Sequence, residues 1–193
     1  MTGGFEALGF GAVLGFSLAM PPGPMNAWIA AIAARSYRAG VITGLGAMTA
    51  DGLVATAVYL LDRNVDVHAI LWAVYLLGAV VMAFLGVRLL RARSADAPTL
   101  PDEQTFVRAL GIGLSNPFQL VWWLTAGLAF AYLGGATLLV GLFGAILVWV
   151  FGFPWAVRTG VRRRPAVGPL IRLASAGILL AFAVYFVFLF AVG

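Results

Sequence analysis

Asp51 is the side chain whose type and position most clearly suggest chemistry. It is the single charged residue in the apolar run 39–61 and lies near its middle. Insertion scales give a cost of roughly 2.5–3.5 kcal/mol for a charge at the centre of a membrane helix, so Asp51 must face water or the interior of a helix bundle. There it could bind a cation, a proton or the ammonium group of a substrate. The alternative is a protonated, hydrogen-bonded aspartic acid with a structural role.

A dense group of helix-breaking residues interrupts the first apolar run of the chain. Pro21, Pro22, Gly23 and Pro24 directly precede Met25 and Asn26. Each proline removes a backbone donor and clashes with the preceding turn, so three within four positions break a helix. Backbone groups freed in hydrocarbon cost several kcal/mol each unless protein or a water-filled cavity satisfies them. The motif therefore predicts two half-helices with an unwound joint buried in the bundle.

A second, milder break is predicted at Asn116 and Pro117, within another long apolar run. Pro117 suits the first turn of a new helix and Asn116 suits its N-cap. An inert kink is the alternative at this position. Interrupted helices in corresponding positions of two halves of a chain are typical of the substrate site of a transporter.

These features combine into one hypothesis about recognition. Half-helices that begin near Pro24 and Pro117 present unpaired N–H groups and positive dipole ends, which suit a carboxylate. Asp51 supplies the counterpart for an ammonium group, so the pair matches a zwitterion such as an amino acid. Asn26, Gln119 and Thr49 could add neutral hydrogen bonds. The predicted substrate-binding residues are Pro22, Gly23, Pro24, Asn26, Asp51, Asn116, Pro117 and Gln119, with Asp51 also predicted to couple to an ion.

The composition indicates that long membrane helices position these residues. Of 193 residues, 63% are apolar and 10% are charged, whereas a soluble domain is about half apolar and a quarter charged. This excludes a soluble globular domain, a disordered tail and a disulfide scaffold. The net charge of +5 comes from arginines that lie between apolar runs without interleaved aromatic residues, so a nucleic-acid partner is not expected. The expected partner is the lipid bilayer.

Six membrane-spanning helices are predicted from the charge-free runs, because a bilayer core needs roughly 20 helical residues per crossing. The uncharged stretch 109–157 is long enough for two spans with a turn near Gly134 and Gly135. The predicted spans are 5–34, 39–61, 67–90, 106–132, 136–157 and 169–191.

The predicted fold is therefore an all-α integral membrane protein with a single domain, 1–193. It divides into a half at about 1–93, a linker at about 94–105 and a half at about 106–193. Three spans per half make the second half inverted relative to the first, with the first and fourth helices broken.

The arginines predict the orientation of the chain in the cell membrane. Eleven of the twelve basic residues fall in the first, third and fifth loops, and the exception is Arg63 in the second loop. Loops rich in basic residues stay in the cytoplasm, so both termini are expected to face outward. The run Arg162, Arg163 and Arg164 is interpreted as a topology determinant, with binding of lipid headgroups as the alternative.

Metal and cofactor chemistry is not expected. The chain has no cysteine, and its one histidine, His68, lies close to Asp62 and Asp66 in a predicted loop region, where solvation is the ordinary state. No catalytic cluster and no nucleotide motif are recognisable, so neither an enzyme nor an ATP-driven pump is predicted.

Three segments resemble the LysE/RhtB family of amino-acid exporters: PPGPMNAW, RAGVITGLGAMTADGLVATAVYLL and LGIGLSNPFQLVWWLTAG. The resemblance extends over nearly the whole chain, including its length and the order of the motifs. It implies secondary export of amino acids or related metabolites from the cytoplasm, driven by an ion gradient. It also implies functional roles for Pro22, Gly23, Pro24, Asp51, Asn116 and Pro117. Phe118 stands where the family often has a basic residue.

The predicted function is thus a secondary active transporter that exports amino acids or related metabolites by alternating access. Coupling to either protons or Na⁺ is expected, with no bound cofactor. The alternatives are a membrane partner or assembly subunit that transports nothing, and a passive channel. The sequence leaves the substrate open, and also whether the chain forms a homo-oligomer.

Overall fold

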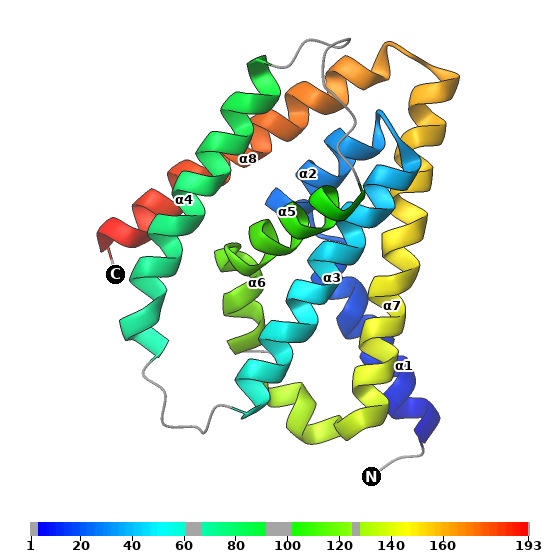
Figure 1. Cartoon of the computed structure of the whole chain (residues 1–193). Coiled ribbons are helices and arrows are strands. Elements are labelled where there is room, and N and C mark those ends of the chain that lie inside the picture. Colours follow the sequence, from blue (N-terminus) through cyan, green and yellow to red (C-terminus); the bar gives the residue numbers. More distant parts are fainter. Residues whose placement is uncertain (1–3, 61–66, 92–101, 125–127, 193) are drawn as a thin grey trace.

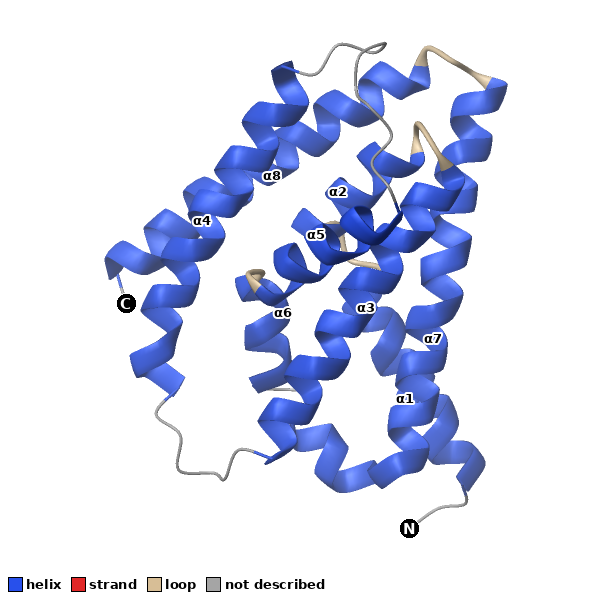
Figure 2. Ribbon diagram, in the orientation of Figure 1, coloured by secondary structure: helices blue, strands red, loops and turns tan. Residues whose placement is uncertain are grey.

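The computed structural model describes residues 4–60, 67–91, 102–124 and 128–192, and every regular element in these ranges is a helix (Figure 2). The predicted all-α class is therefore confirmed. The eight helices are α1 (Gly4–Ala19), α2 (Pro24–Ala33), α3 (Tyr37–Leu60), α4 (Val67–Arg91), α5 (Asp102–Leu114), α6 (Pro117–Trp122), α7 (Leu128–Arg163) and α8 (Val167–Val192).

Both predicted breaks are present. α1 and α2 meet at an angle of 78° across residues 20–23, and Pro24 occupies the first turn of α2. Gly23 caps α2 in an extended conformation. α5 ends at Leu114, and α6 begins at Pro117 with Asn116 as its N-cap residue. The covalent restrictions of proline explain why the helices stop at these positions.

The helices pack mainly in pairs: α1 along α7, α4 along α8, and α3 across α5 (Figure 1). Glycines allow the close approach of α1 to α7. A Cβ atom added to Gly11 would lie 2.1 Å from the carbonyl oxygen of Leu138, and one added to Gly15 would lie 2.2 Å from that of Leu142. Small residues at such positions let two helix backbones touch.

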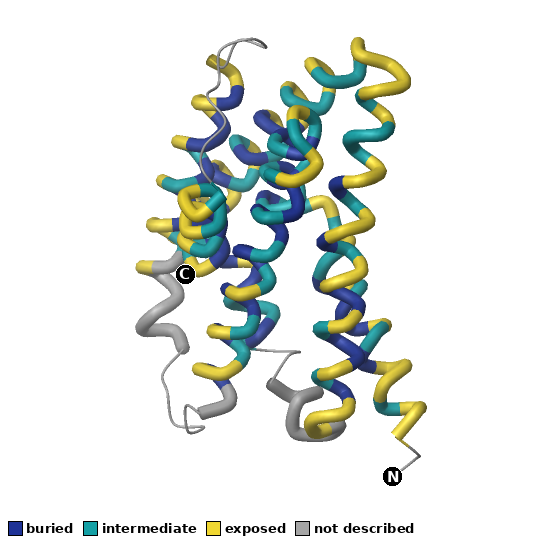
Figure 3. Tube along the Cα trace, turned by 45° about the vertical axis from the view of Figure 1, so that its right-hand side comes forward, coloured by how far each residue is buried: buried dark blue, intermediate teal, exposed yellow. Residues whose placement is uncertain are grey.

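The buried apolar side chains form two clusters. One joins α2, α4 and α8 and includes Met82, Leu179 and Phe186. The other joins α1, α3 and α7 around Leu142 and Trp123. Figure 3 shows the buried residues on the inner sides of the helices, while the outer sides are largely exposed.

Large apolar side chains cover much of the exposed surface, as expected where lipid is the solvent. Val184, Leu170 and Val148 are 71%, 65% and 62% exposed. Three described helical segments are long and apolar enough to cross a membrane: Tyr37–Val58, Gly135–Arg163 and Val167–Ala191. The bent pair α1 and α2 passes the same test when taken together, which gives up to four spans.

The predicted count of six spans and the inverted repeat are not confirmed by these criteria, and both stay predictions. α3, α4 and α8 nevertheless agree with three of the predicted spans to within two residues at each end. The predicted turn near Gly134 is visible as an interruption of α7, where Gly135 adopts φ 59° and ψ −155°. Most of the predicted linker lies outside the described residues.

Candidate functional site

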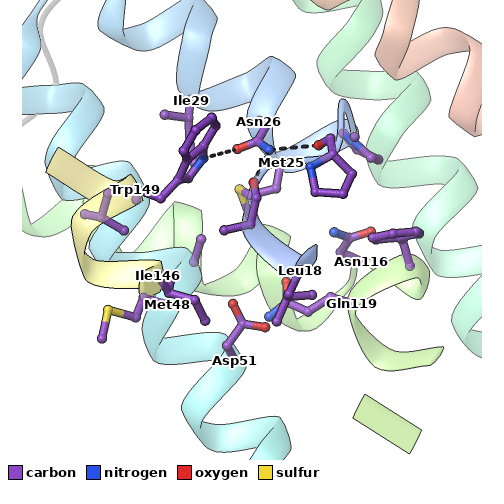
Figure 4. A pocket seen from close by; sticks show the side chains of 18 residues that line it. Leu18, Met25, Asn26, Ile29, Met48, Asp51, Asn116, Gln119, Ile146 and Trp149 are labelled. Carbon is purple, nitrogen blue, oxygen red and sulfur yellow. Dashed lines mark hydrogen bonds between the residues drawn. The ribbon is translucent and has the colours of Figure 1, made fainter. Parts of the chain in front are cut away.

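The two helix breaks line one small cavity, with a volume of about 70 Å³ (Figure 4). α3 and α7 complete its wall. Its polar side chains come from four different places in the chain: Asn26 from α2, Asp51 from α3, Asn116 and Gln119 from the α5–α6 break, and Trp149 from α7. The remaining wall is mostly apolar and includes Leu18, Met48, Phe118 and Ile146. We call this space the Asp51 cavity.

Asp51 is the one ionisable side chain among the described residues that line the Asp51 cavity. It is 8% exposed, and its Oδ1 accepts a hydrogen bond of 2.8 Å from the indole Nε1–H of Trp123. Trp123 is 1% exposed and stacks on Phe143 with ring centroids 6.0 Å apart. A rigidly packed neutral donor therefore orients the carboxylate and leaves its charge uncompensated, because a hydrogen bond from an indole adds no positive charge.

Two buried amides beside Asp51 have polar atoms without a partner. Asn116 Oδ1 and Gln119 Nε2 make no hydrogen bond within the described part of the chain, although these residues are 3% and 4% exposed. Asn116 occupies the N-cap position of α6, yet its side chain does not cap the helix. An unsatisfied buried polar atom costs about 1–3 kcal/mol, so these two atoms are available to a ligand. Figure 4 shows Gln119 next to Asp51.

Asn26 holds the α1–α2 break together. Its Nδ2 donates to the carbonyl oxygens of Ala19 and Pro21, the latter at 2.9 Å. Its Oδ1 accepts a bond of 3.2 Å from the Nε1–H of Trp149 (Figure 4). One side chain thus links the end of α1, the unwound joint, the start of α2 and the middle of α7.

The N-terminus of α2 supplies a positive end to the Asp51 cavity. No side chain caps it, and Gly23, Pro24 and Met25 all line the cavity. N–H groups in the first turn of a helix have no partner within the helix, and here Met25 and Asn26 carry them because Pro24 has none. α6 has only six residues and provides a much smaller dipole than was expected for the half-helix at Pro117.

A second cavity, of about 330 Å³, adjoins the first and shares Gly23, Asn26 and Trp149 with it. It lies between α2, α7 and α8. Its lining includes Phe153 and Ile171, and none of the described residues that line it is ionisable. Trp149 stacks on Phe153 with ring centroids 4.8 Å apart. We call this space the apolar cavity.

The structure brings together most of the residues that were predicted to bind substrate. Pro22 lines the apolar cavity instead of the Asp51 cavity, and Pro117 is fully buried against Gly78, lining neither. Thr49 is exposed and donates to the carbonyl oxygen of Leu45 in its own helix. The residues of the predicted set that line the Asp51 cavity are Gly23, Pro24, Asn26, Asp51, Asn116 and Gln119.

Sequence reasoning missed the two tryptophan partners. Trp149 was not singled out, and Trp123 was considered only as packing or cavity lining. An indole within a charge-free run needs a hydrogen-bond partner when it is buried, and this was the available signal. Within the described ranges no group of three His, Cys, Asp or Glu residues could hold a metal. Asp62 and Asp66, weighed above as neighbours of His68, lie outside those ranges.

A carboxylate and unpaired amides, enclosed where two broken helices meet among long apolar helices, define the class of membrane transport proteins. The sequence profile of the LysE type translocator family matches residues 16–189, and the chain belongs to this family. It is accordingly a multi-pass integral membrane protein and a translocator, not an enzyme.

One relative is a Bacillus subtilis (strain 168) protein named "Putative amino acid efflux protein YcgF". It is 32% identical over 160 residues, covering 72% of this chain and 74% of the relative. No solved structure matches this chain.

Proposed function

We propose that this translocator exports amino acids from the cytoplasm as a secondary transporter that works by alternating access. The proposal depends on one observation: the Asp51 carboxylate and the uncapped N-terminus of α2 line the same small cavity, beside two amides with unpaired atoms. Family membership and the name of the Bacillus relative support an amino acid as the substrate.

The polar groups match the two charged ends of an amino acid. The ammonium group binds Asp51 and donates to Asn116 Oδ1, which lacks a donor. The carboxylate binds the first-turn N–H groups of α2 and accepts from Gln119 Nε2. Each group of the zwitterion thereby meets a buried partner of opposite polarity, which offsets the cost of leaving water.

The size of the two cavities indicates which amino acids fit. A water-sized atom occupies roughly 10–15 Å³ by this measure, so a space of 70 Å³ holds about five or six such atoms. That is enough for the ammonium group, Cα and the carboxylate, but the side chain must extend elsewhere. The adjoining apolar cavity of about 330 Å³ accommodates it beyond Asn26 and Trp149. Because the described lining of that cavity carries no charge, the favoured substrates have bulky, uncharged side chains.

A single carboxylate also accounts for coupling. Asp51 binds either the ammonium group of the substrate or a coupling cation, H⁺ or Na⁺, but not both, because no second acid lines the described part of the Asp51 cavity. Competition at one site makes the two species exchange: the cation enters as the amino acid leaves. Such exchange distinguishes a carrier from a passive channel and from a membrane partner that transports nothing.

Counterflow in proteoliposomes tests this function. Vesicles are loaded with unlabelled leucine, alanine, lysine or glutamate, and uptake of the labelled amino acid is followed. We expect transient accumulation that is largest for leucine and is abolished or strongly reduced in Asp51→Asn. Asp102→Asn is the matched control, because it neutralises an aspartate that pairs with Arg38 away from both cavities. Absence of counterflow for every amino acid would refute the function, while equal counterflow in Asp51→Asn would refute the role of Asp51.

We propose the topology inferred from the arginines, with both termini outside the cell and the arginine-rich loops in the cytoplasm. The chain has no cysteine, so single cysteines can be introduced without removing any. A membrane-impermeant maleimide added to intact cells is expected to label a cysteine appended after Gly193 and to leave Ser36→Cys unlabelled until the membrane is opened. The reverse pattern would invert the topology and with it the direction of transport.

A further inference from the structure

A third cavity, of about 450 Å³, lies where the α2–α3 connection faces the C-terminal part of α7. Four arginines line it, Arg35 and Arg38 from the connection and the start of α3, and Arg158 and Arg162 from α7. Among the described residues, no acidic side chain lines it, and it shares no lining residue with the Asp51 cavity or the apolar cavity. We call it the arginine pocket.

The charges of the arginine pocket are only partly compensated. Arg38 forms an ion pair with Asp102 of α5. Four arginines against this one aspartate leave a net charge of +3. Arg158 and Arg162 are one helical turn apart, and like charges at this spacing repel each other. An anion bound between the guanidinium groups would remove this repulsion.

The donors of the pocket suit the oxygen atoms of a phosphate group. Arg158 Nη1 donates to the carbonyl oxygen of Ala34 at 2.8 Å, which holds its guanidinium group in place at the end of α2. The hydroxyl-bearing residues Ser36 and Thr159 also line the pocket. A guanidinium group offers paired, charge-assisted hydrogen bonds that match phosphate geometry, and several of them around one space bind phosphate more tightly than a single charge does.

The position of the pocket in the bundle corresponds to the level of lipid headgroups. One candidate membrane span begins at Tyr37 and another ends at Arg163, so the pocket lies where two spans end together. Trp155 and Tyr37, which line it, are 62% and 40% exposed. Exposed tryptophan and tyrosine are typical of the membrane–water interface. Basic pockets between membrane helices bind the phosphate of anionic lipid headgroups in this setting.

We propose that the arginine pocket binds a phosphate group, supplied either by the headgroup of an anionic lipid or by free inorganic phosphate. This site is separate from the proposed transport site, so it does not depend on the identity of the substrate. The bound phosphate links the end of α2 to the end of α7, since Arg35 and Arg38 lie on one side and Arg158 and Arg162 on the other.

Binding can be measured on the purified full-length chain in detergent. Native mass spectrometry counts retained phosphatidylglycerol and phosphatidylcholine, and a thermal unfolding assay measures stabilisation by inorganic phosphate. The test variant is Arg35→Gln with Arg162→Gln, both exposed residues of the pocket. The matched control is Arg163→Gln with Arg164→Gln, which removes the same charge from exposed arginines that do not line the pocket.

We expect the test variant to bind phosphatidylglycerol about 30-fold more weakly than the unchanged chain, equivalent to about 1 kcal/mol for each arginine removed near a membrane surface. The control variant should bind it nearly as well as the unchanged chain. Stabilisation by inorganic phosphate with no preference for phosphatidylglycerol over phosphatidylcholine would identify the free ion as the source and still support the site. Equal losses in both double variants, or no response to either phosphate source in the unchanged chain, would overturn the proposal.

Discussion

Replacing Asn26 with leucine keeps a side chain of similar volume but removes all three hydrogen bonds that hold the α1–α2 break. The carbonyl groups of Ala19 and Pro21 lose their donor, and the indole of Trp149 loses its acceptor. No water from bulk solvent is at hand for groups buried at membrane depth, so these carbonyl groups would remain unsatisfied.

The expected loss of stability follows from this count. Each buried group left without a partner costs about 1–3 kcal/mol, so two carbonyl groups together cost about 4 kcal/mol. For a chain of this size, about 1 kcal/mol corresponds to a shift of 2–4 °C in the melting temperature, which gives a fall of about 10 °C. Trp149→Phe removes only the third bond and keeps an aromatic ring against Phe153, so it should lower the melting temperature by about 3 °C.

Fluorescence-detected size exclusion after heating measures both shifts on unpurified detergent extracts. The double variant Asn26→Leu with Trp149→Phe closes a mutant cycle, and it should melt at nearly the temperature of Asn26→Leu alone, because the bond between the two side chains is already absent. If Asn26→Leu melted within about 2 °C of the unchanged chain, the argument that Asn26 holds the break would be refuted.

Gly15→Ala should destabilise the protein by about 1–3 kcal/mol, because the added Cβ would lie 2.2 Å from the carbonyl oxygen of Leu142 and would push α1 from α7. Gly144→Ala, which has nothing within 4 Å, should be neutral or stabilising by up to about 1 kcal/mol in the same melting assay, and equal effects of the two would contradict this interpretation of the α1–α7 contact. Trp123→Phe keeps the ring but removes the N–H donor to Asp51, so counterflow should fall by about tenfold with little change in expression. Unchanged counterflow would exclude a role for Trp123 in orienting the carboxylate.

The sequence alone predicted the class of the fold and the places where its helices break. Hydropathy requires helices because a chain in hydrocarbon must satisfy its own backbone hydrogen bonds. Pro24 and Pro117 stop helices through covalent geometry, which operates in any tertiary context. The structure confirms both breaks for this reason.

The number of membrane crossings was harder to predict. α3, α4 and α8 agree with predicted spans, whereas α5 and α6 are short helices that do not form one long apolar element. Hydropathy counts apolar residues along the chain, but it does not register whether a break bends the chain across the membrane or back within it. The angle of 78° between α1 and α2 is a property of the packed structure.

For the site, the sequence could identify Asp51, Asn26, Asn116 and Gln119 as costly polar residues in apolar surroundings, because the energetic penalty is local. It could not identify their partners. Trp123 lies 72 residues from Asp51, and Trp149 lies 123 residues from Asn26. Contacts at such separation depend on how the helices pack. Composition and proline geometry thus determined the helices and their breaks, whereas only the tertiary structure decided which side chains meet in the cavity, because it alone determines which helix faces adjoin.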